Sequence, residues 1–350
     1  MSTADAVFVV WWVGVTAYAV FGGADFGAGF WSLAAGRGER GRRARELVDW
    51  AIGPVWEANH VWLIFVLVVL WTAFGTAFAS IFSTLFIPLS LAALGIVLRG
   101  SGFAFQQTAR RARGRAFAER LFGLSSLLTP FFMGTVVGAV AGGRVPVGNA
   151  EGDPVTSWFN LLSIVIGVLF VATSAYLAAV FLVSDARRAG APDLERYFTQ
   201  RALAAAVVAG ALAVAGIIEL RADARYLYDG LTGDALPLVI VSALCGAAVL
   251  VLLRRGAPRG ARPFAVGAVV AVIAGWGVAQ HPYLLPKVLT IDAGAAPSAT
   301  LTGVLIVFGV AVVLVIPSMA LLYTLAQRDL VAEGEAPRAP TGGGGTEPMR

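Results

Sequence analysis

Long apolar runs alternate with short polar connections along the whole chain. Nine of the runs are long enough to cross the roughly 30 Å of hydrocarbon in a lipid bilayer. Because only helices or closed barrels span a bilayer, the pattern predicts an all-α integral membrane protein with nine transmembrane helices. The predicted spans are residues 7–33, 52–73, 78–99, 119–141, 158–183, 201–220, 236–253, 263–282 and 301–325.

The connections are too short to hold a soluble domain. Residues 1–328 are therefore expected to form one polytopic membrane domain. Residues 329–350 are rich in Pro, Gly and Glu and are expected to form a disordered cytoplasmic tail. The Arg-rich connections at 34–51 and 184–200 have similar lengths, which fits two four-helix bundles followed by a ninth helix.

Composition agrees with a membrane setting. Hydrophobic residues make up 58% of the chain and charged residues only 13%, and the mean hydropathy is +0.79. A soluble domain would need far more charge on its surface. The single cysteine, Cys245, excludes a disulfide or a multi-thiolate metal site within this chain.

The basic residues are distributed unequally between alternate connections. Of the 26 Lys and Arg residues, 22 fall on one side of the predicted membrane, and only Arg144, Arg221, Arg225 and Lys287 fall on the other. The positive-inside rule places the N-terminus outside and the C-terminus in the cytoplasm. The arginine clusters then lie beside anionic lipid headgroups, so the sequence pI of 9.8 does not indicate nucleic-acid binding.

Polar side chains inside the predicted spans are the candidates for function, because ionisable groups in a bilayer are costly and usually face protein or water. Asp25 lies in span one among several glycines, which allow neighbouring helices to approach closely. Glu57 and His60 share one face of span two, with Trp56 and Asn59 beside them.

Arg99 ends span three at the same predicted depth, on the cytoplasmic side. The sequence thus predicts a proton path through Glu57, Asp25, His60 and Asn59, with Arg99 and Trp56 as a structural polar ring. An acidic residue in a membrane helix suits a proton relay. A structural ion pair between Asp25 and Arg99 is the competing interpretation.

Haem ligation by this chain is disfavoured. The other histidine, His281, lies near the opposite face, so the two imidazoles do not form an axial pair at one depth. Two further function classes stay open: an ion-coupled secondary transporter, and a structural scaffold for a partner. Against a transporter, the spans show no matching pair of broken helices, and the polar residues gather on one side of the membrane.

Several sequence blocks resemble those of subunit II of cytochrome bd-type quinol oxidases. The blocks are GGADFGAG, IGPVWEANHVWLI, LRGSGFAFQ, GWGVAQHPYLLP, LTIDAGAAPSATL and PSMALLYTL. They cover spans one to three and eight to nine closely. The pattern GPVW[DE]xNxVWL is long and therefore specific.

The resemblance implies a multi-pass subunit of a terminal oxidase in the bacterial cytoplasmic membrane. The complex would oxidise quinol, reduce oxygen to water and take protons from the cytoplasm. Haem b and haem d would reside in the partner, subunit I, while this chain would ligate neither haem nor metal. A small accessory subunit and a bound structural quinone or lipid are compatible with the resemblance; the residues that would bind such a cofactor are unknown.

Individual positions carry over from the resemblance. Glu57 matches the carboxylate after GPVW, and Asp25 matches the second Asp of a pattern resembling DGFDxGxG. Gly22 stands at the first Asp of that pattern, which places a relay through two span-one carboxylates in doubt. His60 stands where other members carry Gln or Glu, and an imidazole titrates near neutral pH.

Overall fold

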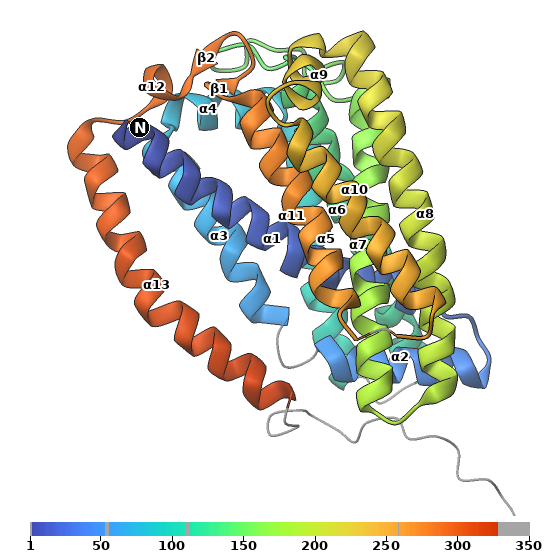
Figure 1. Ribbon diagram of the computed structural model, residues 1–350. Coiled ribbons are helices and arrows are strands. Elements are labelled where there is room, and N and C mark those ends of the chain that lie inside the picture. The colour runs from blue at the N-terminus through green and yellow to red at the C-terminus, as the bar shows by residue number, and fades with distance from the viewer. Residues whose placement is uncertain (1, 53–55, 109–111, 258, 328–350) are drawn as a thin grey trace, which may run out of the picture.

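Helices dominate the chain, and most run roughly along one direction (Figure 1). The computed structural model describes residues 2–52, 56–108, 112–257 and 259–327. The tail predicted to be disordered, 329–350, lies outside the described residues. The helices are α1 (Thr3–Ala34), α2 (Glu39–Ile52), α3 (Trp56–Ala73), α4 (Gly75–Thr84), α5 (Phe86–Thr108), α6 (Ala112–Ala141), α7 (Leu161–Arg188), α8 (Pro192–Asp223), α9 (Arg225–Thr232), α10 (Leu236–Arg254), α11 (Ala261–Gln280), α12 (Ile291–Gly294) and α13 (Ser298–Gln327).

Seven helices in the described part of the chain are long and apolar enough to cross a membrane: α1, α6, α7, α8, α10, α11 and α13. Helices α3 and α4 make an eighth if they are taken as one bent span, and the apolar part of α5, Phe86–Gly102, is shorter. Each of the nine predicted spans lies mainly in one helix, in the order α1, α3, α5, α6, α7, α8, α10, α11 and α13. The chain is therefore a multi-pass, almost entirely helical protein.

The third predicted span begins later than the hydropathy pattern indicates. Residues 78–84 belong to α4, which is bent by 115° from α3, and α5 begins only at Phe86. Pro88 lies in the first turn of α5, where a missing N–H does no harm. It has no hydrogen to donate to the Thr84 carbonyl, so a continuous helix through this point would lose a bond and clash.

Capping residues set where several helices begin. The Ser2 side chain accepts a hydrogen bond from the Asp5 N–H at 3.1 Å, and Asp5 accepts one from the Ser2 N–H at 2.8 Å. This reciprocal pair satisfies two N–H groups at the start of α1. Asn160 caps α7 by accepting from the Ser163 N–H at 3.0 Å. Each cap fixes the first residue of its helix, because the capping side chain accepts from an N–H group that has no partner within the helix.

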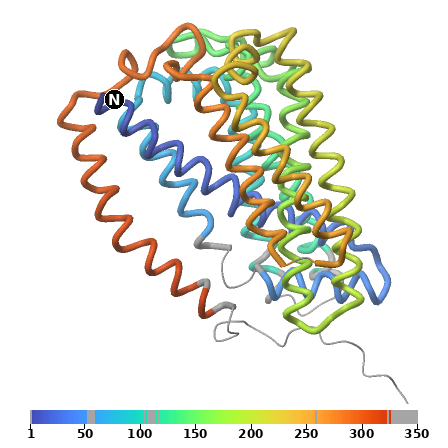
Figure 2. The backbone as a smooth tube through the Cα atoms, in the orientation of Figure 1, coloured from blue at the N-terminus to red at the C-terminus, as the bar shows by residue number. Residues whose placement is uncertain are grey.

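The helices pack in a continuous series of pairs. Helix α1 contacts α3 and α6, and α5 packs against α6; α7 packs against α8, and α10 against α11. Helix α7 also contacts both α1 and α6, so the packing is continuous across the bundle. Helix α13 lies at the edge against α1 and α3 (Figures 1 and 2). Its hydrophobic side chains are largely exposed on the isolated chain.

The two ends of the bundle differ in character (Figure 1). The N-terminus, α9, α12 and a short hairpin lie at one end, and α2 with the α7–α8 and α10–α11 connections lies at the other. The hairpin was not predicted: β1 (Tyr283–Leu285) pairs antiparallel with β2 (Leu289–Thr290). The Arg-rich connections of the described chain thus gather at the end opposite to the N-terminus, as the alternating pattern requires.

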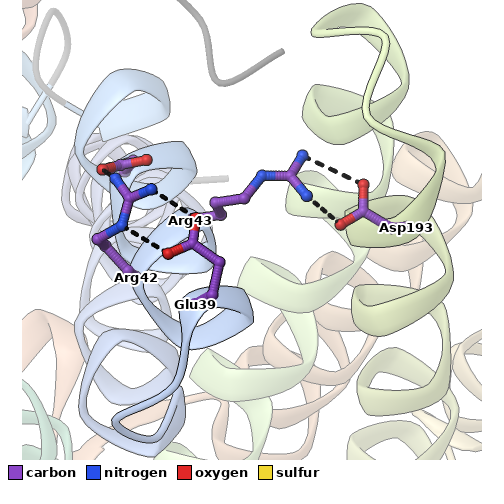
Figure 3. A network of polar contacts seen from close by, with 5 residues as sticks. Glu39, Arg42, Arg43 and Asp193 are labelled. Carbon is purple, nitrogen blue, oxygen red and sulfur yellow. Dashed lines mark hydrogen bonds and ion pairs between the residues drawn. The ribbon is translucent and has the colours of Figure 1, made fainter. Parts of the chain in front are cut away.

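Helix α2 is an amphipathic helix inside a stretch that the hydropathy pattern marks only as an Arg-rich connection. Its Ala44, Leu47 and Val48 are buried in an apolar cluster with α7 and α8. On the other side Arg42 hydrogen-bonds Glu39, which holds the pKa of that carboxyl below its ordinary value. Arg43 reaches Asp193 at the start of α8, with one N···O distance of 3.2 Å (Figure 3).

Close approach of α1 and α7 depends on glycine. A Cβ atom at Gly27 would overlap the backbone carbonyl of Ser174. One turn further, the Trp31 indole N–H donates to the Ala175 carbonyl at 2.8 Å. Small residues at such crossings let membrane helices gain dispersion contact where no hydrophobic effect between helices operates.

Gly27→Ala should therefore destabilise the assembled protein by about 1–3 kcal/mol, because the methyl group forces α1 away from α7. Gly210→Ala in α8 is the matched control, since a Cβ there meets no atom within 4 Å. The measurement is the thermal unfolding midpoint in one detergent. Equal midpoints for the two variants would show that the crossing tolerates separation.

Two ion pairs on α2 should differ in strength. The Arg43 side chain is 10% exposed and Asp193 38%, whereas Arg42 and Glu39 are 57% and 68% exposed. A double-mutant cycle with Arg43→Gln and Asp193→Asn should give a coupling of about 1 kcal/mol, weakened by salt. The same cycle on Arg42 and Glu39 should give a smaller coupling, because both side chains are mostly exposed to water. A larger coupling in the exposed pair would contradict this account.

Candidate functional site

Asp25 lies in the C-terminal half of α1, and it is buried, with 4% of its surface exposed. Glycines surround it along the helix and permit close neighbours on two sides. A Cβ atom at Gly29 would overlap the Ser126 side chain and lie 3.0 Å from an Arg99 nitrogen. The glycines therefore open the backbone of α1 to polar groups from other helices.

Asn59 of α3 is the partner that the structure gives the Asp25 carboxylate. Its side-chain amide donates to Asp25 Oδ2 at 2.7 Å, and Asn59 is itself only 3% exposed. A hydrogen bond to a charged acceptor is stronger than one between neutral groups. The bond joins two helices at one depth, which the sequence positions had indicated.

Arg99 of α5 is almost completely buried, at 1% exposure. One guanidinium nitrogen donates to the backbone carbonyl of Asp25 at 3.0 Å, and another donates to the Ser126 hydroxyl. Its carbon lies 5.0 Å from the Phe26 ring centroid and 4.5 Å from that of Phe122. Cation–π contact of this kind stabilises a cation removed from water.

The proposed ion pair between Asp25 and Arg99 takes a different form from the one expected. Among the described residues no ion pair within 4.0 Å joins the Asp25 carboxylate to Arg99. Arg99 instead holds the main chain of residue 25, and the carboxylate faces Asn59. The two charges still interact electrostatically at longer range.

His60 lies beside this group, with its ring in aromatic surroundings. The imidazole is 6.2 Å from the Tyr18 ring and 5.9 Å from the Phe26 ring, centroid to centroid. Both rings belong to α1, so His60 is part of the contact between α1 and α3 next to Asp25. Its position brings a third polar residue of the predicted path to the same place.

Glu57 and Trp56 belong to the first turn of α3 by their backbone, but their side chains lie outside the described residues. The predicted contribution of the Glu57 carboxylate and of the Trp56 ring therefore stays a prediction. The helix direction puts Glu57 one turn before His60 on the same face.

Four residues at the site were not singled out from the sequence: Tyr18, Phe26, Phe122 and Ser126. The aromatic residues look like ordinary core positions in a membrane helix, and nothing in their spacing distinguishes them. Ser126 offered a weak signal, because it is a polar residue within the apolar run 119–141. Its hydroxyl donates to the Phe122 carbonyl at 2.6 Å while it accepts from Arg99.

The arrangement is a buried polar chain built by four helices. It contains an amide, a carboxylate, a guanidinium, a hydroxyl and an imidazole, which are groups suited to holding water and moving protons. Within the described part of the chain no group of three His, Cys, Asp or Glu residues could hold a metal ion.

A second buried carboxylate has a different environment. Asp185 of α7, 5% exposed, accepts from Arg188 at 2.8 Å and also from Arg262 at the start of α11. Arg262 additionally donates to the Phe181 carbonyl at 2.7 Å. Two guanidinium groups thus neutralise Asp185 directly, and this cluster ties α7 to α11.

Comparisons with known proteins agree on one family. Residues 3–326 match the family described as cytochrome bd terminal oxidase subunit II. In Bacillus subtilis (strain 168), the protein named "Putative cytochrome bd menaquinol oxidase subunit II" is 25% identical over 337 residues, covering 93% of this chain and 95% of the relative. A "Cytochrome bd ubiquinol oxidase subunit 2" of the same organism is 29% identical over 114 residues, 33% of each chain.

The fold agrees as well. A chain of the bd oxidase from Geobacillus thermodenitrificans superposes with a TM-score of 0.74 at 26% identity, covering 93% of this chain and 98% of that one. The family match extends over nearly all described helices and includes every block of the sequence resemblance. It decides in favour of the oxidase interpretation over the ion-coupled transporter. The chain belongs to the family of cytochrome bd terminal oxidase subunit II, and it is a membrane-embedded subunit of an oxidoreductase complex that includes a partner subunit I.

Proposed function

We propose that this chain is the haem-free subunit II of a quinol-oxidising terminal oxidase in a bacterial cytoplasmic membrane. It supports the haem-bearing subunit I and supplies part of the path by which cytoplasmic protons reach the oxygen-reducing site. The relatives named for menaquinol and ubiquinol oxidases support quinol as the electron donor of the complex. Haem b and haem d reside in the partner.

The observation that carries the proton-path proposal is the buried chain from Asn59 through Asp25 to Arg99. Its members come from three helices and meet where hydrocarbon would otherwise exclude polar groups. Such a cluster would be costly as mere packing, because apolar residues of similar size often stabilise a core equally well. Glu57, at the first turn of α3, would be the entry group on the cytoplasmic side.

The geometry supports a clear division of roles. Asn59 fixes the orientation of the Asp25 carboxylate through one oxygen. Arg99 fixes the backbone of the same residue. Its positive charge would balance the negative charge of the Asp25 carboxylate after a proton has left it. His60 and Glu57 on α3 would extend the path toward the cytoplasm. Trp56 would belong to the wall of the path.

The haem-free role is supported by how the two histidines are distributed. His60 is in the first part of α3, which begins at the Arg-rich end of the bundle, and His281 follows α11 at the opposite end (Figure 1). His281 lies 3.6 Å from an Asp5 oxygen through its Nε2 atom. The pair could not ligate one haem iron from both faces.

The topology proposal follows from the charge of the bundle ends. Nine spans, with the N-terminus outside and the C-terminus in the cytoplasm, place the Arg-rich end with α2 on the cytoplasmic side. Helix α13 would be the ninth span, separate from the two four-helix bundles predicted from the sequence. Its exposed apolar side chains would face lipid or a partner subunit.

Two carboxylate variants test the proton path. Asp25→Asn and Glu57→Gln should each lower quinol-dependent oxygen consumption about tenfold or more, because a relay loses a group that exchanges protons. Assembly with subunit I should persist, and the reduced-minus-oxidised haem spectrum should stay unchanged because neither residue ligates haem.

Asp185→Asn is the matched control for Asp25→Asn, since Asp185 is buried to the same extent but is contacted by two arginines. It should lower thermal stability while leaving the turnover of each assembled complex near the wild-type value. Full turnover in both Asp25→Asn and Glu57→Gln would instead leave the chain as a scaffold for its partner.

Cysteine labelling tests the topology. In a Cys245→Ser background, Glu151→Cys in the α6–α7 connection should react with a membrane-impermeant maleimide in intact cells, because that end faces outward. Gly38→Cys in the α1–α2 connection should react only after the membrane is permeabilised. Both positions are exposed. The reverse pattern would invert the proposed orientation.

A further inference from the structure

The side chain of Tyr18 lies along α1, over the backbone of Gly22. A Cβ atom at Gly22, one turn later, would lie 2.7 Å from Cε2 of the Tyr18 ring. The ring therefore occupies space that any other residue at position 22 would need. This is also the position where the resembling pattern has its first Asp, so the tyrosine covers the site of a missing carboxylate.

The ring is held in place by neighbours from two helices. It packs edge-on to Phe26 at 6.4 Å, with an interplanar angle of 88°, and it lies 6.2 Å from the His60 imidazole. Phe26 in turn contacts the Arg99 guanidinium. Tyr18 is thus part of the same packed group as the proposed proton path.

The Tyr18 hydroxyl is buried and has no hydrogen-bond partner among the described residues. Buried polar groups in native proteins nearly always have a partner, and where the protein supplies none the partner is usually water. The hydroxyl interacts electrostatically with Asp25 of α1 and Arg99 of α5, and His60 of α3 is the titratable group beside its ring.

Another tyrosine shows that burial alone is not the argument. The Tyr176 hydroxyl on α7 is also buried without a partner among the described residues. Its ring, however, belongs to an apolar cluster of residues from α1, α2, α7, α8, α10 and α11. No residue of the proposed path lies in that cluster. What distinguishes Tyr18 is that its hydroxyl interacts electrostatically with a carboxylate and a guanidinium and that its ring lies beside an imidazole.

We propose that the Tyr18 hydroxyl is a further member of the proton path, and that Gly22 is required because it makes room for the Tyr18 ring. The proposal rests on the proton-path function given above. A neutral phenol both donates and accepts hydrogen bonds. It can receive a proton from one neighbouring water and release its own to the next, so that its charge and the electron count stay unchanged.

Tyr18→Phe tests the hydroxyl while keeping the ring. Turnover of the assembled complex should fall about tenfold, less than for loss of a group in the chemical step, because the path only delivers protons. The KM for quinol should not change. The decline of turnover with rising pH should begin at lower pH than in the wild type, because proton delivery then limits the rate.

Tyr176→Phe is the matched control, and it should leave both turnover and the pH profile unchanged. Gly22→Ala should reproduce the effect of Tyr18→Phe by displacing the ring, whereas Gly23→Ala should not, since a Cβ there comes no closer than 3.6 Å to any neighbour. In the double variant, Gly22→Ala should add little to Tyr18→Phe, because both remove the same hydroxyl from its position.

Wild-type turnover and pH profile in Tyr18→Phe would overturn this inference. If Asp25→Asn is impaired in the same preparation, the proton path stands without Tyr18; if Asp25→Asn is also fully active, the proposed function itself fails. Should Tyr18→Phe not assemble, the comparison of Gly22→Ala with Gly23→Ala decides. Equal turnover in those two glycine variants would then overturn the inference.

Discussion

The packing of α1, α5 and α6 around Asp25 depends on the contacts of the buried Arg99 guanidinium. In the apolar interior of a membrane protein such a cation must find acceptors and polarisable faces within the protein. It finds the Asp25 carbonyl, the Ser126 hydroxyl and two phenylalanine rings. These contacts join α5 to α1 and α6, and Gly29 permits them by presenting no side chain.

Because Arg99 holds the main chain, the Asp25 carboxylate is left to the Asn59 amide. This differs from Asp185, whose carboxylate is contacted by two arginines. Contact with two guanidinium groups makes Asp185 a structural tie between α7 and α11. A carboxylate held by a neutral amide can change its protonation without losing its neighbour. This difference between the two environments is the reason for proposing the proton path through Asp25 and not through Asp185.

Glycine distribution links packing to chemistry. Gly27 lets α1 meet the α7 backbone, Gly29 admits Arg99, and Gly22 accommodates the Tyr18 ring. One face of α1 therefore serves three different neighbours within about two turns. Helix–helix contact and the polar chain are not separable features here, because the same missing side chains provide both.

The sequence by itself determined the membrane class, the nine apolar runs, the arginine asymmetry and most of the polar candidates. These follow from composition and spacing, because a bilayer permits few backbone structures and penalises charge. The resemblance of several blocks was enough to indicate the family. Asp25, Asn59 and Arg99 could all be named from sequence because a polar residue in an apolar run is conspicuous.

Only the tertiary structure decided how those residues meet. Arg99 binds the carbonyl of Asp25 and not its carboxylate, and the Tyr18 ring covers Gly22. The helix α4 ends at Thr84, and α5 begins at Phe86. Helix α2 packs across the bundle end, although hydropathy marks it only as a basic connection. The reason is that helix rotation and the crossing of α1 with its neighbours set these contacts. They join residues far apart in the chain, and local periodicity does not specify such pairings.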